Sequence, residues 1–202
     1  ELASEGKTVV YFAENEQVIG LVALMDVPNE EAMNAIHYFK SQNIETTMIT
    51  GDAKLTGEAV GRLVGVDQVY ANVLPEEKSA IVDQLKREVG MTGMVGDGIN
   101  DAPALVNADI GVAMGDGTDI AIDVADVVVM KNDLSKLGYA HRVSKRLNKI
   151  VQQNIIFSML VVATLIILNF LGIANIAFSV LIHEGSTLVV IFNGLRLLVN
   201  TK

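Results

Sequence analysis

The sequence contains no cysteine and no tryptophan, and only three prolines among its 202 residues. Without cysteine there is no disulfide, no thiolate metal ligand and no cysteine nucleophile in this chain. Positive charge is also scarce, because 15 Lys and Arg face 24 Asp and Glu, which gives a net charge of −9. Nucleic-acid binding requires a basic surface, so we expect no nucleic-acid partner.

Charge of either sign is almost absent from residues 150–202, which carry only Glu184, Arg196 and Lys202. This region holds two apolar runs, Ile155–Ile173 and Ile176–Leu198, each long enough to cross a bilayer. Basic residues lie outside both far ends and none lies in the short turn between them, which places both ends in the cytoplasm. We therefore expect a linker helix and a two-helix transmembrane hairpin over residues 134–202; a buried hairpin of a soluble protein is the alternative.

The remainder alternates between strand and helix patterns. Two β-rich runs, Thr8–Phe12 and Val18–Met25, come first. Asn29 is then suited to cap a helix over residues 30–41. Later strand patterns cover 46–50, 68–71, 91–95, 110–113 and 127–130, and helix patterns separate most of them. Strands separated by helices predict an α/β fold, a Rossmann-like parallel sheet with helices on both faces, and the apolar run 91–95 reads as a buried strand.

Polar residues gather where two of these strands end. The segment 94–103 places Asp97, Asn100 and Asp101 in a glycine-rich loop that suits Mg²⁺ held beside a phosphate. Thr50, followed by Gly51 and Asp52, ends an earlier strand, and ligands of parallel sheets bind at the carboxyl ends of strands. Lys78 lies near a helix start, where it can neutralise phosphate charge. The alternative reading is structural: a turn bonded to its own backbone, a strand-end cap and a solvated lysine.

Three segments, 48–52, 74–78 and 94–103, resemble signature blocks of P-type ATPases, and 108–119 is similar to the segment that follows in that family. The resemblance implies a haloacid dehalogenase-like phosphorylation domain over 21–133, preceded by the tail of a nucleotide-binding domain over 1–20. It also implies an ATP-driven cation pump in a cell membrane, multi-pass, with this domain in the cytoplasm. The implied site residues are Thr50, Gly51, Asp52 and Lys78 at the phosphoryl group, Asp97 and Asp101 at Mg²⁺, and Asn100 beside them.

That family also requires an Asp-Lys-Thr-Gly-Thr motif, whose Asp becomes phosphorylated, and this sequence does not contain it. The chain does not begin with Met. We therefore expect it to be the C-terminal part of a pump, inactive without the missing N-terminal part. The segment 26–29 occupies the hinge where relatives often place an arginine, and this chain has no arginine there.

The second apolar run contains a polar block, His183, Glu184, Ser186 and Thr187. Ionisable residues at membrane depth are costly and point to function, although helix packing is the alternative. The block resembles heavy-metal P-type ATPases, closest to the branch associated with cobalt, iron and zinc. Imidazole and carboxylate suit borderline divalent ions, so we expect these four residues to bind Co²⁺, Fe²⁺ or Zn²⁺; Asn154, Met159 and Asn169 are weaker candidates.

Two other functions are compatible with the residues. The first is a membrane-anchored phosphatase of the haloacid dehalogenase type with Asp26 as nucleophile. Such enzymes usually place a second Asp two residues later as general acid, and this chain has Pro28 there. The second is a non-catalytic split subunit that binds Mg²⁺ and docks on another chain. An upstream Asp-Lys-Thr-Gly motif would discriminate against both.

Overall fold

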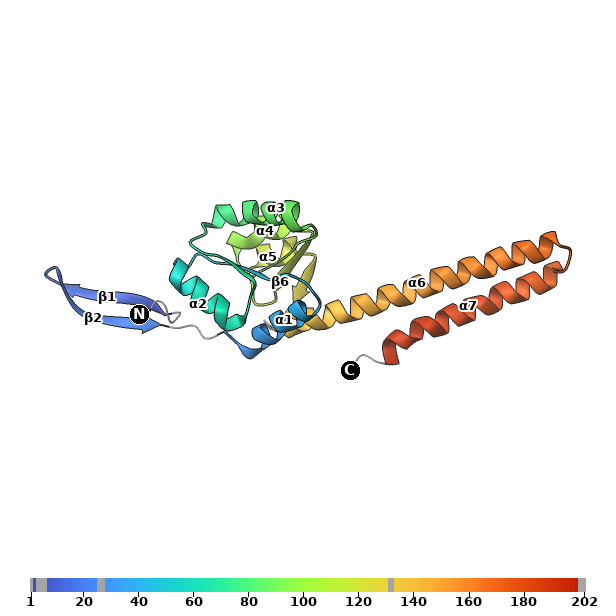
Figure 1. The fold of residues 1–202 in the computed structure, drawn as a ribbon, viewed down its shortest axis with the longest axis horizontal. Helices are drawn as coiled ribbons and strands as arrows, with labels where there is room; N and C mark the ends of the chain where they lie inside the picture. Colours follow the sequence, from blue (N-terminus) through green and yellow to red (C-terminus); the bar gives the residue numbers. More distant parts are fainter. Residues whose placement is uncertain (1, 3–6, 25–27, 131–132, 200–202) are drawn as a thin grey trace. The chain divides into compact units, whose positions relative to one another are not determined.

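The computed structural model describes residue 2 and residues 7–24, 28–130 and 133–199. Two compact units are present, Glu1–Gly138 and Tyr139–Lys202 (Figure 1). Met25, Asp26 and Val27 lie outside the described residues, so the predicted hinge and the alternative nucleophile are not placed. The predicted division at residues 20 and 133 stays a prediction.

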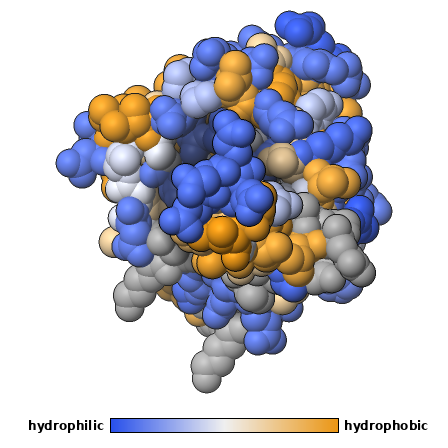
Figure 2. Space-filling model, turned by 90° about the vertical axis from the view of Figure 1, so that its left-hand side faces the viewer, coloured by the Kyte–Doolittle hydropathy of each residue, from blue (hydrophilic) through white to orange (hydrophobic). Residues whose placement is uncertain are grey.

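The first unit begins with an antiparallel hairpin of β1 (Thr8–Glu14) and β2 (Gln17–Leu24). Asn15 and Glu16 form its turn with positive φ angles of 47° and 66°, the backbone that two-residue hairpin turns favour. Apolar side chains remain exposed, among them Tyr11 at 64% and Ile19 at 67%, and Figure 2 shows hydrophobic surface beside hydrophilic surface on one face of the molecule. A lone two-stranded hairpin is marginal in water.

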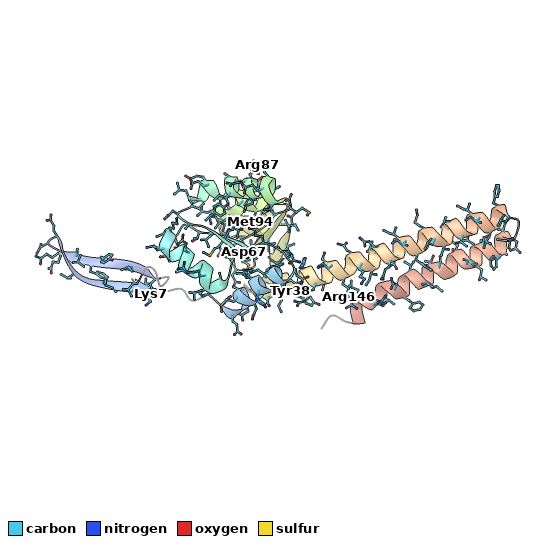
Figure 3. The ribbon with its side chains drawn as sticks, in the orientation of Figure 1. Lys7, Tyr38, Asp67, Arg87, Met94 and Arg146 are labelled. Carbon is cyan, nitrogen blue, oxygen red and sulfur yellow. The ribbon has the colours of Figure 1, made fainter. Side chains whose placement is uncertain are left out.

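Helix α1 (Glu30–Ser41) begins as the sequence predicts, because the Asn29 side chain accepts a hydrogen bond from the Ala32 amide at 2.8 Å. At its other end, the Lys40 ammonium lies 2.8 Å from the Asp67 carboxylate, labelled in Figure 3. The Lys40 hydrogen bond, together with those from Thr46, lowers the pKa of Asp67 to about 2. This ion pair ties α1 to the segment before β4.

Five parallel strands follow, connected by helices. The strands are β3 (Thr47–Ile49), β4 (Gln68–Tyr70), β5 (Gly93–Gly96), β6 (Ile110–Met114) and β7 (Val127–Val129). The helices are α2 (Lys54–Val64), α3 (Lys78–Val89), α4 (Ala102–Asn107) and α5 (Asp119–Val124), with 3₁₀ turns η2 (Pro75–Glu77) and η3 (Ile99–Asp101). The predicted alternation of strand and helix is confirmed.

Within the described residues, the parallel strands hydrogen-bond in two groups. Strands β3 and β4 pair with each other, and β5, β6 and β7 form a separate sheet. Within the described chain, β3 and β5 each pair along one edge only. The predicted burial of the run 91–95 is wrong, because Met91 is 84% exposed and Val95 is 39% exposed. Met91 lies before β5, which begins only at Gly93, and within the described chain β5 has a neighbouring strand on one edge only.

Helices nevertheless cover both faces of β6, as the predicted fold class requires. Ala113 packs with Leu105 of α4 and Ala121 of α5 on one face. Val112 and Met114 pack with Val129 on the other face, against Leu134 and Leu137. Alternate residues of a strand point to opposite faces, so one short strand joins two core clusters.

The second unit consists mainly of α6 (Ser135–Phe170) and α7 (Ile176–Val199). The predicted linker and the first apolar run as far as Phe170 form one continuous helix of 36 residues, and residues 171–173 lie beyond its end. By length and composition, both helices can cross a membrane, and their side chains project outward along both (Figure 3). The amide of Asn193 donates to the Asn154 side chain at 2.8 Å, so Asn154 contributes to helix packing.

Candidate functional site

A buried ion pair between Lys78 and Asp101 lies at the centre of the candidate phosphoryl-binding site. Lys78 is the first residue of α3, and its ammonium donates to an Asp101 carboxylate oxygen at 2.7 Å. The two side chains are only 19% and 9% exposed. Such a pair persists in a low-dielectric site because each charge compensates the other. The structure thus brings together two residues that the sequence places 23 positions apart.

The loop after β5 wraps around Asp101. Its second carboxylate oxygen faces the amides of Asp97 and Gly98 at 3.3 and 3.4 Å. Gly96 has no room for a side chain, because a Cβ there would lie 2.6 Å from the Asp101 Cβ. Asp97 and Asn100 remain exposed at the surface of this loop. Asp101 therefore organises the loop, and Asp97 presents a carboxylate to solvent.

Thr50 follows β3 and forms a small turn with Asp52. Its hydroxyl donates to the Asp52 carboxylate at 2.7 Å and accepts from the Asp52 amide at 3.1 Å. The Thr50 carbonyl accepts from the Val73 amide at 3.1 Å. Because the chain runs from Val73 through η2 to Lys78, this contact ties the Thr50 turn to the segment that delivers the lysine.

A local cap fixes the approach to Lys78. The amide of Leu74 donates to the Glu77 carboxylate at 2.8 Å, and Pro75 opens η2, where its missing N–H is no loss. In the described part of the chain, no three His, Asp or Glu side chains converge on a metal-sized position. Mg²⁺ fits Asp97 all the same, since this ion commonly uses one or two carboxylates, with phosphate and water completing its shell.

The polar block of α7 is divided between two kinds of contact. His183 and Glu184 line a groove of about 720 Å³ between α6 and α7. The hydroxyls of Ser186 and Thr187 instead donate to the His183 carbonyl, at 2.6 and 3.3 Å. The role of all four as metal ligands stays a prediction.

Sequence reasoning missed Ser179, which lines the same groove. Its buried hydroxyl has no hydrogen-bond partner among the residues that the structure describes. The signal was available, since Ser179 precedes His183 by four residues and therefore shares its helix face.

The first unit matches a known family. A family model of haloacid dehalogenase-like hydrolases matches residues 1–109. The chain belongs to the haloacid dehalogenase-like hydrolase family. It is 46% identical to the zinc-transporting ATPase of Bacillus subtilis, covering 98% of this chain and 31% of that protein. It is 39% identical to a probable cadmium-transporting ATPase of Listeria monocytogenes, covering 98% of this chain and 28% of that protein.

A solved structure extends the match to both units of this haloacid dehalogenase-like chain. The crystal structure of a zinc-transporting PIB-type ATPase in its E2.Pi state has a TM-score of 0.88 and 34% identity, covering 98% of this chain and 32% of that chain. The resemblance to heavy-metal P-type ATPases and the predicted fold class are confirmed. The chain spans about a third of the length of these relatives.

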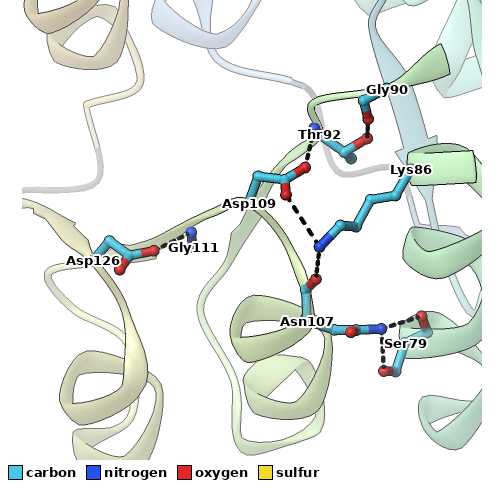
Figure 4. A network of polar contacts seen from close by, with 8 residues as sticks. All are labelled: Ser79, Lys86, Gly90, Thr92, Asn107, Asp109, Gly111 and Asp126. Atoms are coloured by element: carbon cyan, nitrogen blue, oxygen red, sulfur yellow. Dashed lines mark hydrogen bonds and ion pairs between the residues drawn. The ribbon is translucent and has the colours of Figure 1, made fainter.

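A second polar network of the haloacid dehalogenase-like unit links α3 to the segment before β6 (Figure 4). The Lys86 ammonium donates to the Asn107 carbonyl at 2.7 Å and lies 3.2 Å from the Asp109 carboxylate. The same carboxylate accepts from the Thr92 amide at 2.8 Å. The Thr92 hydrogen bond, followed by that of Lys86, lowers the pKa of Asp109. Sequence reasoning did not identify this network, because its members come from three separate elements.

Proposed function

We propose that this chain supplies the Mg²⁺- and phosphoryl-binding half of the phosphorylation site, and a metal-binding membrane helix, of an ATP-driven heavy-metal cation pump. One observation carries the proposal: the buried contact between Lys78 and Asp101 lies at the end of a parallel strand, in a chain similar over 98% of its length to zinc- and cadmium-transporting ATPases.

Phosphoryl transfer depends chiefly on positioning and on neutralising charge. The Lys78 ammonium supplies a positive charge that Asp101 holds in place, and the Thr50 hydroxyl supplies a donor once it turns from Asp52. Asp97, with Asp101 beside it, would hold Mg²⁺, which when bound neutralises charge on the phosphoryl oxygens. Gly51 leaves backbone accessible next to Thr50, and Asn100 offers an exposed amide at the loop.

The unpaired edges of β3 and β5 support a site completed by another segment of the pump. An open strand edge readily accepts a further strand. We place there the strand that carries the phosphorylated Asp. Its carboxylate would attack the γ-phosphoryl group of ATP, forming an aspartyl phosphate and releasing ADP, and water would then release inorganic phosphate. The exposed apolar residues of the β1–β2 hairpin support residues 1–20 as the tail of the nucleotide-binding domain.

In the membrane, His183 and Glu184 would bind the transported divalent cation. Both line the groove between α6 and α7, and imidazole and carboxylate suit Zn²⁺, Co²⁺ and Fe²⁺. Relatives named for zinc and cadmium transport support an ion of this class. Basic residues at the start of α6 and near the end of α7 support a cell-membrane protein with its phosphorylation domain in the cytoplasm.

The test uses the full-length pump that contains this chain, reconstituted in liposomes, with ATP hydrolysis measured against Zn²⁺, Co²⁺, Fe²⁺ and Cd²⁺. We expect stimulation by one or more of these ions and its loss in Glu184→Ala. The control is Leu188→Ala, which changes an exposed apolar residue one turn further on. Metal preference and activity that survive Glu184→Ala would show that the ion binds elsewhere.

A further inference from the structure

We infer that Asn107 is a positioning residue for Lys78. Its side-chain amide holds the first turn of α3 in place, and the Lys78 ammonium is thereby held at Asp101 and at the phosphoryl group. The inference rests on the proposed phosphoryl-binding role of Lys78 and adds a residue that the signature blocks do not include.

The contacts are made to Ser79, the residue that follows Lys78, and Figure 4 shows the Asn107 side chain beside Ser79. The Asn107 amide nitrogen donates to the carbonyl oxygen of Ser79 at 3.1 Å and to its hydroxyl oxygen at 3.2 Å. The Ser79 hydroxyl in turn reaches the Pro103 carbonyl at 3.4 Å. Both Asn107 and Ser79 are partly buried, so water competes weakly for these groups.

Asn107 also contacts a second residue of α3, Lys86. As the last residue of α4, it has a carbonyl without a partner in its own helix, and the Lys86 ammonium donates to that carbonyl at 2.7 Å. Ser79 and Lys86 are seven residues apart, which places them on one face of α3. Two contacts along this face fix both the position and the rotation of α3 against α4.

Rotation of α3 matters because of what its first residue does. A lysine side chain is a flexible four-carbon stem that ends in a point charge, so its backbone must be placed accurately for the ammonium to meet a fixed target. A displacement of about 1 Å at a catalytic group can cost on the order of 100-fold in rate. Asn107 binds Ser79, the residue that follows Lys78. Loss of this contact would therefore release the first turn of α3, which carries the lysine.

The experiment measures inhibition of the metal-stimulated ATPase of the full-length pump by orthovanadate, used as a phosphate-like probe. Asn107→Asp keeps the shape of the side chain but removes the N–H donor, leaving a carboxylate opposite the Ser79 carbonyl. We expect the half-inhibitory vanadate concentration to rise about 5- to 10-fold, with the KM for ATP unchanged. The half-inhibitory concentration does not depend on how much of the enzyme is folded.

A double variant tests whether the effect passes through Lys78. In a Lys78→Ala background ATP hydrolysis is expected to be lost, so orthovanadate binding is measured directly there. Asn107→Asp should weaken that binding no further, because residues that act through one contact are not additive. Ser79→Ala, which removes one of the two acceptors, should give a smaller shift in the same direction. The matched control is Gln84→Glu, the same amide-to-carboxylate change on the exposed face of α3.

Unchanged vanadate inhibition in Asn107→Asp, or an equal shift with and without Lys78, would overturn the inference and leave Asn107 with a structural role only. These outcomes are separate from failure of the proposed function. If the proposed function is wrong, the unaltered pump itself will show no metal-stimulated ATPase activity, or that activity will not respond to vanadate.

Discussion

Gly117 offers a sharp test of the loop that carries Asp97. It lies in the turn between β6 and α5, and a Cβ at this position would lie 2.6 Å from the Asp97 carbonyl oxygen and 2.7 Å from the Met114 carbonyl oxygen. The next residue, Thr118, donates its amide to the same Asp97 carbonyl at 2.9 Å. The turn therefore supports the Asp97 loop from behind, and Gly117→Ala would push against it.

The size of the effect follows from these distances. An ordinary van der Waals contact begins near 3.4 Å, so the Asp97 carbonyl must move by roughly 0.8 Å to accommodate the methyl group. Both contacting atoms belong to the backbone and cannot rotate away. Overpacking of this kind costs about 1–3 kcal/mol of stability. A shift approaching 1 Å in the Asp97 loop lowers the rate of phosphorylation by roughly 10- to 100-fold.

The assay follows phosphorylation of the full-length pump by radiolabelled ATP as a function of Mg²⁺ concentration. We expect Gly117→Ala to be slower and to need more Mg²⁺ for half-maximal phosphorylation. The control is Gly93→Ala, where the new Cβ would lie 3.7 Å from the Ile110 carbonyl oxygen and fits without movement. A folded Gly117→Ala variant with the Mg²⁺ dependence of the unaltered pump would refute the coupling between this turn and Asp97.

Three further predictions concern stability. Because folding lowers the pKa of Asp109, its ionised carboxylate stabilises the folded chain above the ordinary pKa of 3.8, and this stabilisation is lost as the pH falls below that value. Asp109→Asn should therefore lower the unfolding midpoint at pH 7 and make the midpoint fall less steeply in acid. Val82→Ala, at a site only 1% exposed, should lower the free energy of unfolding by about 2 kcal/mol, measured by denaturant unfolding. Met91→Ala, at a site 84% exposed, should leave that free energy almost unchanged. Asn193→Leu should break the contact with Asn154 and lower thermal stability in detergent, with Phe192→Leu, which is 67% exposed, as the comparison.

Local signals in the sequence were enough for much of the fold. The Asn29 cap, the alternation of strands and helices, and the two apolar runs each depend on a few consecutive residues, and the structure confirms them. The blocks around Thr50, Lys78 and Asp97 were also visible, because glycines and carboxylates at strand ends carry a chemical meaning before any contact is known.

Contacts between distant residues were not visible in this way. The sequence offers no measure of the 2.7 Å approach of Lys78 to Asp101, nor of the pairing between Asn107 and Ser79. It also does not show that the described parallel strands hydrogen-bond in two groups, β3 with β4 and β5 with β6 and β7, because a strand pattern records apolar residues and not which strand lies beside them. Hydrogen bonding between strands and packing of α3 on α4 depend on three-dimensional proximity, which only the folded chain establishes.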